Sequence, residues 1–386
     1  MLIYDYVIAG SGASGLMLAY RMSQDDFFSN KAVLILDKEN KDSNDRTWCY
    51  WEKGRGEWDF LLSKSWDTIY FGSRDYSDTI DLDGYSYKML RSKDFYRFVK
   101  EEISKKTNFR FEKEEILNIE DNGLSVKITT KTKEYISNKV LSSIFDPEII
   151  KSKPSFVYLK QHFVGWFVRT DSPVFNPDVA GFMDFDIPQK GNTRFMYVLP
   201  TSHHEALIEY TLFSETLLLF DQYEQEIASY MNARYAGVKY EIVEKENGNI
   251  PMTCFPFQYQ NTKNLMYIGS AGGWTKASTG FTFANSLRIS LKLVSFLKKE
   301  SDFTSFRLKN RYWYYDLIFL NVLHKHNEAG STVFASIFKN NNIKDVFTFL
   351  DEKGTFWKDL KIMFRTQPKV RFILSAFRSA MMLIRS

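Results

Sequence analysis

Cysteine is scarce in this sequence, and long apolar runs are absent from it. Among 386 residues there are two cysteines, Cys49 and Cys254, which lie far apart. This count excludes a disulfide framework and a CxxC metal site, and it is typical of a reducing compartment. No run reaches 18 apolar residues, so we expect no membrane-spanning helix. No charged and apolar leader precedes the first strand, so we expect no signal peptide.

Other catalytic signatures are missing as well. The sequence has no internal repeat, no Walker loop and no Gly-x-Ser-x-Gly elbow, which removes sequence support for a P-loop NTPase or an α/β-hydrolase. His324 and His326 lie two apart in a helical pattern and point to different faces. His203-His204 fits a polar turn. We therefore predict no metal site, and we expect no nucleic-acid partner.

Aromatic residues, by contrast, are abundant at 17% of the chain, which suits the lining of a large apolar site. The net charge of +4 is unevenly distributed. Residues 301–386 carry 14 Lys and Arg against 7 Asp and Glu, so the C-terminal end is basic and the rest slightly acidic. Residues 369–385 form an amphipathic helical pattern with Arg371, Arg378 and Arg385 along one stripe. This helix either docks on the body of the protein or lies in a membrane interface.

The N-terminal segment has the spacing Gly-x-Gly-x-x-Gly at Gly10, Gly12 and Gly15. An apolar strand pattern precedes the motif and helix-forming residues follow it. In such a turn the first glycine bends the chain, the second admits a pyrophosphate and the third packs helix against strand. A second apolar strand, 32–36, ends in Asp37, which is placed to accept a ribose hydroxyl. The pattern predicts dinucleotide binding, and the position of the motif near residue 1 favours FAD over NAD.

A second cofactor signal lies about 260 residues later. A short strand feeds the small-residue turn Gly269-Ser270-Ala271-Gly272-Gly273, which resembles the second FAD fingerprint of flavoproteins with Ser270 where Asp is common. Gly280 precedes a helical pattern over 281–297, whose N-terminus would face the cofactor and stabilise negative charge on a reduced flavin. Two segments distant in sequence thus point to the same ligand.

Two arginines between these signals are further candidates. Arg46-Thr47-Trp48 follows a polar loop, and it is either a packed surface corner or a flavin contact. Arg91 precedes a helical pattern over 95–103, for which Ser92 is the expected N-cap, and it either contacts the cofactor or is solvated. Residues 109–120 and 124–130 alternate as strands joined by a turn at 121–123. The residues we expect to contact the cofactor are Gly10, Gly12, Ala13, Gly15, Asp37, Arg46, Thr47, Arg91, Gly269, Ser270 and Gly280.

In the middle of the chain the sequence pattern changes to the period of two residues that is typical of β-strands. Strands are predicted over 163–168, 181–185, 194–199 and 206–211, followed by a helix over 215–240, which indicates an antiparallel sheet inserted between nucleotide-binding segments. Glu209 interrupts the last strand and is either a solvent-facing residue or a functional acid. The fold class is therefore α/β with an α+β insertion: a Rossmann-like FAD-binding domain of the glutathione-reductase/p-hydroxybenzoate-hydroxylase type, an antiparallel substrate sheet and a helical C-terminus. The expected bounds are 1–60, 89–150 and 250–300 for the FAD domain, 61–88 and 151–249 for the sheet domain, and 301–386 for the helical region.

Taken together, the motifs resemble those of bacterial lycopene beta-cyclases over nearly the whole chain. The segments that carry the resemblance are the N-terminal glycine motif, 46–48, His162-Phe163-Val164-Gly165-Trp166, Met183-Asp184-Phe185, 197–200, Ile208-Glu209-Tyr210-Thr211, 250–252, 269–274 and Ser278-Thr279-Gly280. In the family the strand glutamate is tied to catalysis, which implies a catalytic role for Glu209. Plant relatives carry two adjacent acids there, whereas residue 210 is Tyr in this chain.

The resemblance implies proton-initiated, non-redox cyclisation of the acyclic ends of lycopene, an intramolecular lyase reaction. It implies FAD that is active when reduced, NAD(P)H as its reductant, lycopene and related carotenes as substrates, and a cytoplasmic protein associated peripherally with the membrane. Trp48, Trp166, Tyr197 and Trp274 are candidates to line the substrate site. The alternatives are a flavin-dependent oxidoreductase, such as a prenyl reductase or monooxygenase acting on a large isoprenoid, and a carotenoid-binding flavoprotein without activity.

Overall fold

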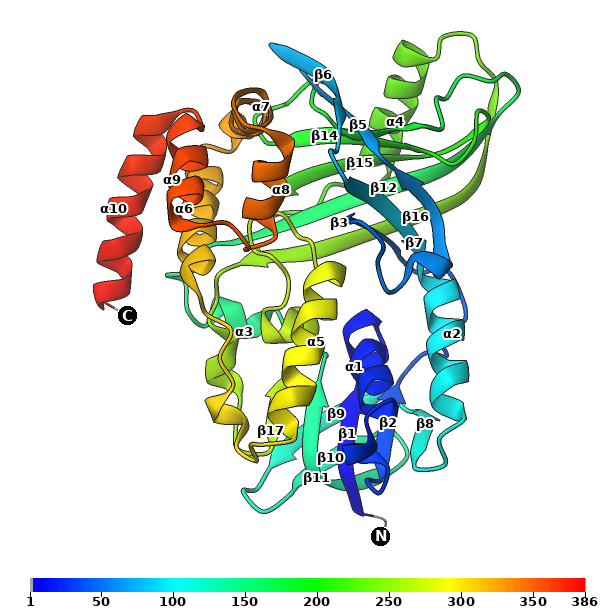
Figure 1. The fold of residues 1–386 in the computed structure, drawn as a ribbon, viewed down its shortest axis with the longest axis vertical. Helices are drawn as coiled ribbons and strands as arrows, with labels where there is room; N and C mark the ends of the chain where they lie inside the picture. Colours follow the sequence, from blue (N-terminus) through cyan, green and yellow to red (C-terminus); the bar gives the residue numbers. More distant parts are fainter. Residues whose placement is uncertain (1–2, 386) are drawn as a thin grey trace. The chain divides into compact units, whose positions relative to one another are not determined.

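The structure is a computed structural model that describes residues 3–385, and side chains as far as Met381. The chain divides into two units, each made of three segments (Figure 1). Unit 1 comprises residues 1–48, 91–156 and 254–310, and unit 2 comprises 49–90, 157–253 and 311–386. Residues 311–386, the greater part of the helical region expected as a separate C-terminal part, thus group with the sheet of unit 2.

Unit 1 is built on a seven-stranded sheet in the order β8-β2-β1-β11-β10-β9, with β17 paired to β11. Its strands are β1 (Ile3–Ala9), β2 (Val33–Asp37), β8 (Phe109–Lys113), β9 (Ile116–Asp121), β10 (Val126–Thr130), β11 (Glu134–Ser142) and β17 (Leu265–Tyr267). The pairs β1–β2, β1–β11, β2–β8 and β11–β17 are parallel, whereas β9, β10 and β11 form an antiparallel meander. The apolar runs of β1 and β2 are buried as expected for central parallel strands.

The helices of unit 1 are α1 (Ala13–Ser23), α2 (Ser92–Ser104), α3 (Glu148–Lys151) and α5 (Phe283–Leu297), and its short 3-10 helices are η1 (Asp26–Phe28), η3 (Phe257–Gln260), η4 (Gly269–Gly272) and η5 (Phe303–Ser305). Helix α1 packs between α2 and α5 (Figure 1). The expectation that Ser92 caps α2 is wrong. Ser92 is the first helical residue and Arg91 is the N-cap, because the Ser92 hydroxyl accepts the backbone N–H of Arg46 instead of one from its own helix.

Unit 2 contains a second seven-stranded sheet in the order β16-β12-β15-β14-β13-β5-β6. Its strands are β5 (Thr68–Ser73), β6 (Tyr76–Asp81), β12 (Tyr158–Thr170), β13 (Val179–Asp184), β14 (Arg194–Pro200), β15 (Glu205–Ser214) and β16 (Tyr240–Thr253). All neighbours are antiparallel except β13 and β5. A small sheet of β3 (Thr47–Lys53), β7 (Tyr85–Arg91) and β4 (Leu62–Trp66) and the 3-10 helix η2 (Asp59–Leu61) complete the β-structure.

One face of this sheet packs on helix α4 (Phe220–Arg234). The core between them is a cluster of buried side chains from β12, β14, β15 and α4, among them Trp166, Ile208, Tyr210 and Ile227. Since side chains alternate along a strand, the residues between these on β15 project to the opposite face of the sheet. Helix α4 is shorter than the range 215–240 in which a helix was expected.

The C-terminal helices are α6 (Arg311–Lys325), α7 (Gly330–Asn340), α8 (Ile343–Leu350), α9 (Phe356–Arg365) and α10 (Lys369–Arg385), with the 3-10 helix η6 (Asn327–Ala329). Helix α10 docks on α6: the Asn321 amide donates to Ser379, and the Ser375 hydroxyl donates to the Ile318 carbonyl oxygen. None of the helices in the described part of the chain is long and apolar enough to cross a bilayer.

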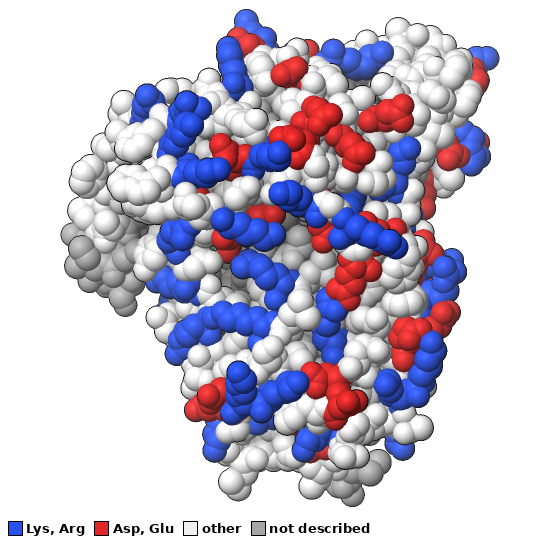
Figure 2. All heavy atoms as spheres, in the orientation of Figure 1, with Lys and Arg blue, Asp and Glu red and all other residues white. Residues whose placement is uncertain are grey.

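Docking leaves an apolar surface on α9 and α10, which we call the α9/α10 surface. It is formed by Phe356, Trp357, Phe364, Val370, Ile373, Leu374, Phe377 and Met381, each at least half exposed. Lys358, Lys361, Arg365, Lys369 and Arg378 are exposed on the same two helices. On the face drawn in Figure 2, the surface over α10 is largely uncharged. The apolar residues of the amphipathic tail are therefore only partly used in packing on α6; the side chain of Arg385 lies outside the described residues.

Candidate functional site

The N-terminal glycine motif forms the strand–turn–helix unit that its spacing predicts. Gly10 has a φ of 99°, and an added Cβ there would lie 2.2 Å from the Ser143 hydroxyl oxygen. A Cβ at Gly12 would meet nothing within 4 Å, so this backbone faces open space. A Cβ at Gly15 would lie 2.0 Å from the Gly10 carbonyl oxygen, because α1 packs directly against the turn. The three glycines thus turn the chain, leave room for a ligand and permit close packing, in that order.

The N-terminus of α1 is suited to an anion. Gly12 is its N-cap and Ala13 its first residue; no side chain caps the helix, and no acidic residue lies in its first turn. The first backbone N–H groups and the positive end of the helix dipole therefore remain for a ligand such as a pyrophosphate.

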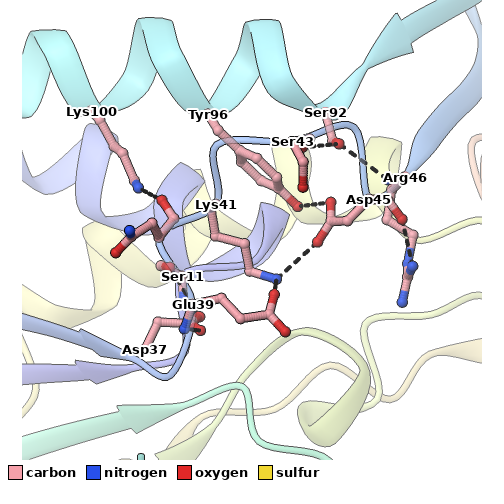
Figure 3. A network of polar contacts seen from close by, with 11 residues as sticks. Ser11, Asp37, Glu39, Lys41, Ser43, Asp45, Arg46, Ser92, Tyr96 and Lys100 are labelled. Atoms are coloured by element: carbon pink, nitrogen blue, oxygen red, sulfur yellow. Dashed lines mark hydrogen bonds and ion pairs between the residues drawn. The ribbon is translucent and has the colours of Figure 1, made fainter. Parts of the chain in front are cut away.

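Asp37 lies at the end of β2 and binds the same turn (Figure 3). Its Oδ2 accepts the Ser11 N–H at 2.6 Å and the Ser11 hydroxyl at 2.9 Å, and its Oδ1 accepts the Glu39 N–H at 2.9 Å. The carboxylate thereby fixes the turn. It retains acceptor capacity for a ribose hydroxyl, because two carboxylate oxygens offer about four lone pairs.

A polar network orders the loop after β2, which carries Arg46 (Figure 3). Lys41 donates to Glu39 and to Asp45, each at 2.9 Å, and the Tyr96 hydroxyl donates to Asp45 at 2.8 Å. Burial opposes ionisation of Asp45, but the hydrogen bonds from Lys41 and Tyr96 outweigh it and lower the pKa of this carboxyl. The loop is therefore held by charge-assisted bonds to α2.

The predicted residues around this loop differ in exposure. Arg46 is exposed and its guanidinium donates to the Asp45 carbonyl oxygen, whereas Thr47 begins β3 and is half-buried. Arg91 is the half-buried N-cap of α2. Within unit 1 the Trp48 ring stacks on Phe283, with centroids 5.0 Å apart, and also contacts the aromatic rings of α2. Arg46 and Thr47 therefore lie beside an aromatic cluster that joins α2 and α5.

The second glycine segment follows β17 and forms the 3-10 helix η4. Gly269 has a φ of 60°, and an added Cβ would lie 2.8 Å from the Ser14 hydroxyl of α1, so the two glycine segments meet within unit 1. Ser270, Thr275 and Thr282 form a chain of hydroxyl hydrogen bonds of 3.1 and 2.9 Å.

The turn before α5 adds a polar atom from the Ser278-Thr279-Gly280 segment, in which only Gly280 was expected to contact the cofactor. Gly280, with a φ of 75°, donates its N–H to the Lys276 carbonyl oxygen. Thr279 is buried, and among the described residues its hydroxyl has no hydrogen-bond partner. A buried polar group without a partner is costly unless a ligand satisfies it. Trp274 is buried, and its carbonyl oxygen accepts from the Asn285 amide.

These features fit a dinucleotide. The open backbone at Gly12, the uncapped start of α1, the spare acceptors of Asp37 and the hydroxyl of Thr279 belong to segments that the fold of unit 1 brings together. Asp37 and the glycines were predicted from spacing, whereas Thr279 was named only as part of the Ser278-Thr279-Gly280 segment and was not predicted to contact the cofactor. The residues present thus agree with an FAD site.

Unit 2 places Glu209 at the centre of its sheet. β15 lies between β12 and β14, with Gly165 opposite Glu209 on one side and Tyr197 on the other. Opposed residues project to the same face, so Glu209 and Tyr197 share the face opposite α4. Glu209 is only 8% exposed. The interpretation of Glu209 as a solvent-facing strand residue is therefore excluded.

Burial changes the acidity of this carboxyl. The Thr211 hydroxyl donates to Oε1 of Glu209 at 2.6 Å, which favours the ionised form. Desolvation, aided by the negative charge of Glu246, outweighs this bond and raises the pKa of Glu209 from 4.5 to about 8. At neutral pH Glu209 is therefore predominantly protonated, and it can act as an acid.

Two tyrosines and a cysteine form a series of contacts that begins beside Glu209. Tyr87 interacts with Tyr197 and with Cys49. Burial, followed by the charge of Glu209, holds the pKa of Tyr197 well above its usual value. The tyrosines are therefore neutral, and their hydroxyls and rings border the acid without adding a charge. Tyr87 and Cys49 were missed from sequence, because they reach this face from β7 and β3 of the small sheet.

Trp166 lies elsewhere. It belongs to the core on the α4 face, where its indole N–H donates to Glu224 at 2.9 Å. It therefore lies on the opposite face of the sheet from Glu209. Of the expected lining residues, Tyr197 alone is adjacent to Glu209 within unit 2.

Comparisons with known proteins agree with this arrangement. The family model described as "Lycopene cyclase protein" matches residues 5–381. No curated protein matches the chain significantly. Among solved structures, a geranylgeranyl bacteriochlorophyll reductase-like protein from Thermoplasma acidophilum is similar with a TM-score of 0.61 at 11% identity, covering 95% of this chain and 97% of that one.

Two further solved structures show the same fold. A flavoprotein/dehydrogenase from Cytophaga hutchinsonii has a TM-score of 0.57 at 11% identity, covering 98% of this chain and 99% of that one. The flavin-dependent brominase Bmp2 has a TM-score of 0.54 at 12% identity, covering 94% and 93%. At these identities the likeness concerns the fold alone, and it confirms the predicted fold class.

Proposed function

Because the chain belongs to the lycopene cyclase family, we propose that it is a lycopene beta-cyclase, which closes the acyclic ends of lycopene into beta-ionone rings. The observation that carries this proposal is Glu209, a buried carboxyl with a pKa raised to about 8 in the middle of a sheet. Cyclisation of an alkene begins with a proton, so the enzyme needs an acid that stays protonated at neutral pH.

The chemistry balances without a redox change. Glu209 gives its proton to a carbon of the terminal double bond, and the resulting cation is attacked by the internal alkene to close the ring. The Glu209 carboxylate then takes a proton from a ring carbon, which yields the new double bond and an isomer of the substrate. The neutral rings of Tyr197 and Tyr87, on the same side of the sheet, favour a cation by about 0.5–2 kcal/mol each where they face it.

The cofactor site of unit 1 has a supporting role in this proposal. The N-terminus of α1, the backbone at Gly12, Asp37 and Thr279 would hold FAD through its phosphate and hydroxyl groups. Bound in its reduced form, FAD would supply negative charge that stabilises the cation. NAD(P)H is the proposed reductant, needed to reduce FAD once and not at each turnover.

The alternative is a flavin-dependent oxidoreductase acting on a large isoprenoid. The reductase-like and dehydrogenase folds among the similar structures are compatible with it. Hydride or oxygen transfer, however, has no need for a carboxyl that is kept protonated by burial. The state of Glu209 therefore favours the cyclase.

Product analysis in deuterium oxide tests the proposal. The protein, with FAD first reduced anaerobically by dithionite, is given lycopene in ordinary water and in deuterium oxide. We expect a cyclic product with the mass of lycopene in water, and one added deuterium per ring in deuterium oxide, since the added proton comes from an exchangeable acid. A reductase would raise the mass in ordinary water, and a monooxygenase would add oxygen; either result would reject the cyclase.

We also propose that the α9/α10 surface binds the membrane in which a carotene is dissolved. Trp357 and Phe377 are 78% and 67% exposed on this surface. Exposed Lys and Arg residues on the same helices complement anionic headgroups, as in other interfacial helices. Docking of α10 on α6 and binding to a membrane are therefore compatible, because they use different sides of the helix.

A further inference from the structure

Gly165 separates two buried carboxyls in the sheet of unit 2. On β12 it lies opposite Glu209 of β15 on one side and opposite Glu246 of β16 on the other. All three residues project to the same face, and both glutamates are buried, at 8% and 6% exposure. The acids are 37 positions apart in sequence, so only the strand register brings them together.

The absence of a side chain at Gly165 lets the glutamates approach each other. Their backbones lie two strand spacings apart, roughly 10 Å. An added Cβ at Gly165 would lie 2.8 Å from the Cδ1 of Leu207, 3.3 Å from the Cγ of Glu246 and 3.4 Å from the Cβ of Glu209. A Leu207 methyl group and the two glutamate side chains therefore share the space over the glycine, the glutamates reach it from opposite sides, and no side chain of β12 stands between them.

We propose that Glu209 and Glu246 form a proton-sharing pair across Gly165, in which Glu246 holds the negative charge and thereby keeps the catalytic proton on Glu209. The proposal rests on the cyclase function proposed above and adds a positioning residue to it. Two carboxyls in one buried site do not both ionise readily, because the second charge is repelled by the first. The pair begins with one proton, gives it to the alkene and regains one from the ring carbon, so its proton count is restored.

The other groups around Glu209 within unit 2 do not supply the negative charge that keeps its proton bound. Thr211 on β15 donates to Glu209 and favours the ionised form. Tyr197 on β14 and Tyr87 on β7 are neutral, and Cys49 on β3 contacts Tyr87. Gly165 on β12 contributes no titratable group. Within unit 2, Glu246 on β16 is the negative group whose charge raises the pKa of Glu209.

The test compares three variants of the full-length, FAD-loaded protein. Glu246→Gln removes the charge and keeps the size. Glu246→Asp keeps the charge and shortens the side chain. Glu244→Gln is the matched control, because Glu244 lies on β16 opposite Phe167, on the same face but beyond the pair. The infrared carbonyl band of the protonated carboxyl is titrated in each, and Glu209→Gln identifies the band.

We expect the midpoint of the Glu209 band to fall by on the order of one pH unit in Glu246→Gln. It should fall by a smaller amount in Glu246→Asp, because the shorter side chain holds the charge farther from Glu209, and it should stay near the wild-type value in Glu244→Gln. The alkaline limb of the cyclisation rate should move to lower pH by the same amount in Glu246→Gln, because the protonated acid is the active form. A merely structural Glu246 would lower the rate at all pH values without moving this limb.

The two readouts separate the two proposals. The infrared titration needs no carotene, so a shifted midpoint without cyclisation would reject the cyclase and keep the pair. Cyclisation by the wild type, with an unchanged midpoint and limb in Glu246→Gln, would overturn the pair and keep the cyclase. If Glu246→Gln does not fold, a midpoint that is lower in Glu246→Asp than in Glu244→Gln still supports the pair, and equal midpoints overturn it.

Discussion

The substitution Glu209→Gln should abolish cyclisation and at the same time stabilise the protein at alkaline pH. The folded protein binds the Glu209 proton up to about pH 8, whereas the unfolded chain releases it near 4.5. The stability contributed by this group is therefore fully present below 4.5 and is lost as the pH rises towards 8. At about 1.4 kcal/mol per pKa unit, the loss amounts to about 5 kcal/mol, a large part of the stability of an ordinary domain.

Glutamine removes this loss of stability at alkaline pH, because it is neutral at every pH and still accepts the Thr211 hydrogen bond. We expect Glu209→Gln to be close to the wild type near about pH 5 and to exceed it by on the order of 4 kcal/mol near about pH 8.5. Urea unfolding at the two pH values measures the difference, and FAD absorbance shows whether the cofactor stays bound.

The control is Glu241→Gln, an exposed residue of the same sheet whose Oε1 pairs with Arg169 at 2.9 Å. A solvent-exposed pair contributes little to stability, and equally at both pH values. Equal stability of Glu209→Gln and the wild type at alkaline pH would refute the assignment of a raised pKa. Retained cyclisation in Glu209→Gln would show that another group supplies the proton, and loss of FAD would show that Glu209 is structural.

Three further predictions concern the cofactor and the membrane. Gly15→Ala should lower the free energy of unfolding by about 1–3 kcal/mol and weaken FAD binding, because the new methyl group would lie 2.0 Å from the Gly10 carbonyl oxygen. An unchanged flavin titration and an unchanged urea midpoint would contradict this prediction. Thr279→Val should raise the Kd for FAD up to about tenfold by removing one hydrogen bond, with no loss of stability in the FAD-free protein; an equal Kd would remove Thr279 from the site. Trp357→Glu combined with Phe377→Glu should abolish flotation with phosphatidylglycerol vesicles. The control Leu124→Glu, which changes a side chain that is 92% exposed in unit 1, should not. Flotation of the double variant would reject membrane binding by the α9/α10 surface.

The sequence predicted those features whose signals are local. The glycine motif with Asp37, the strands β12 to β15 and the helix α5 follow from spacing and periodicity within short windows. The run 109–120 was read as one strand, but the chain forms β8 and β9 there, because one pairs in parallel with β2 and the other antiparallel with β10. Such a division depends on the partner strands and is not visible in the alternation of the segment itself.

The surroundings of Glu209 required the tertiary structure. Its position in a strand and the choice of face were visible from Ile208 and Tyr210 on either side. The sequence did not show whether that face is exposed to solvent or buried, because burial depends on strands distant in sequence. The same holds for Glu246: the sequence suggested a search for a second acid beside Glu209, at position 210, whereas the strand register supplies one two strands away.

The alternation along β15 explains how one strand can hold a destabilised acid in place. Ile208 and Tyr210 are completely buried in the core against α4, and the Arg194 guanidinium donates to the Tyr210 hydroxyl at 2.9 Å. These contacts fix the backbone on both sides of Glu209, so the carboxyl cannot swing into water to ionise. An acid that protonates an alkene must keep its proton until the substrate arrives, and a rigid, dry strand position achieves this chiefly through desolvation, to which the charge of Glu246 adds. The stability lost at Glu209 is thus offset on the opposite face of the same strand.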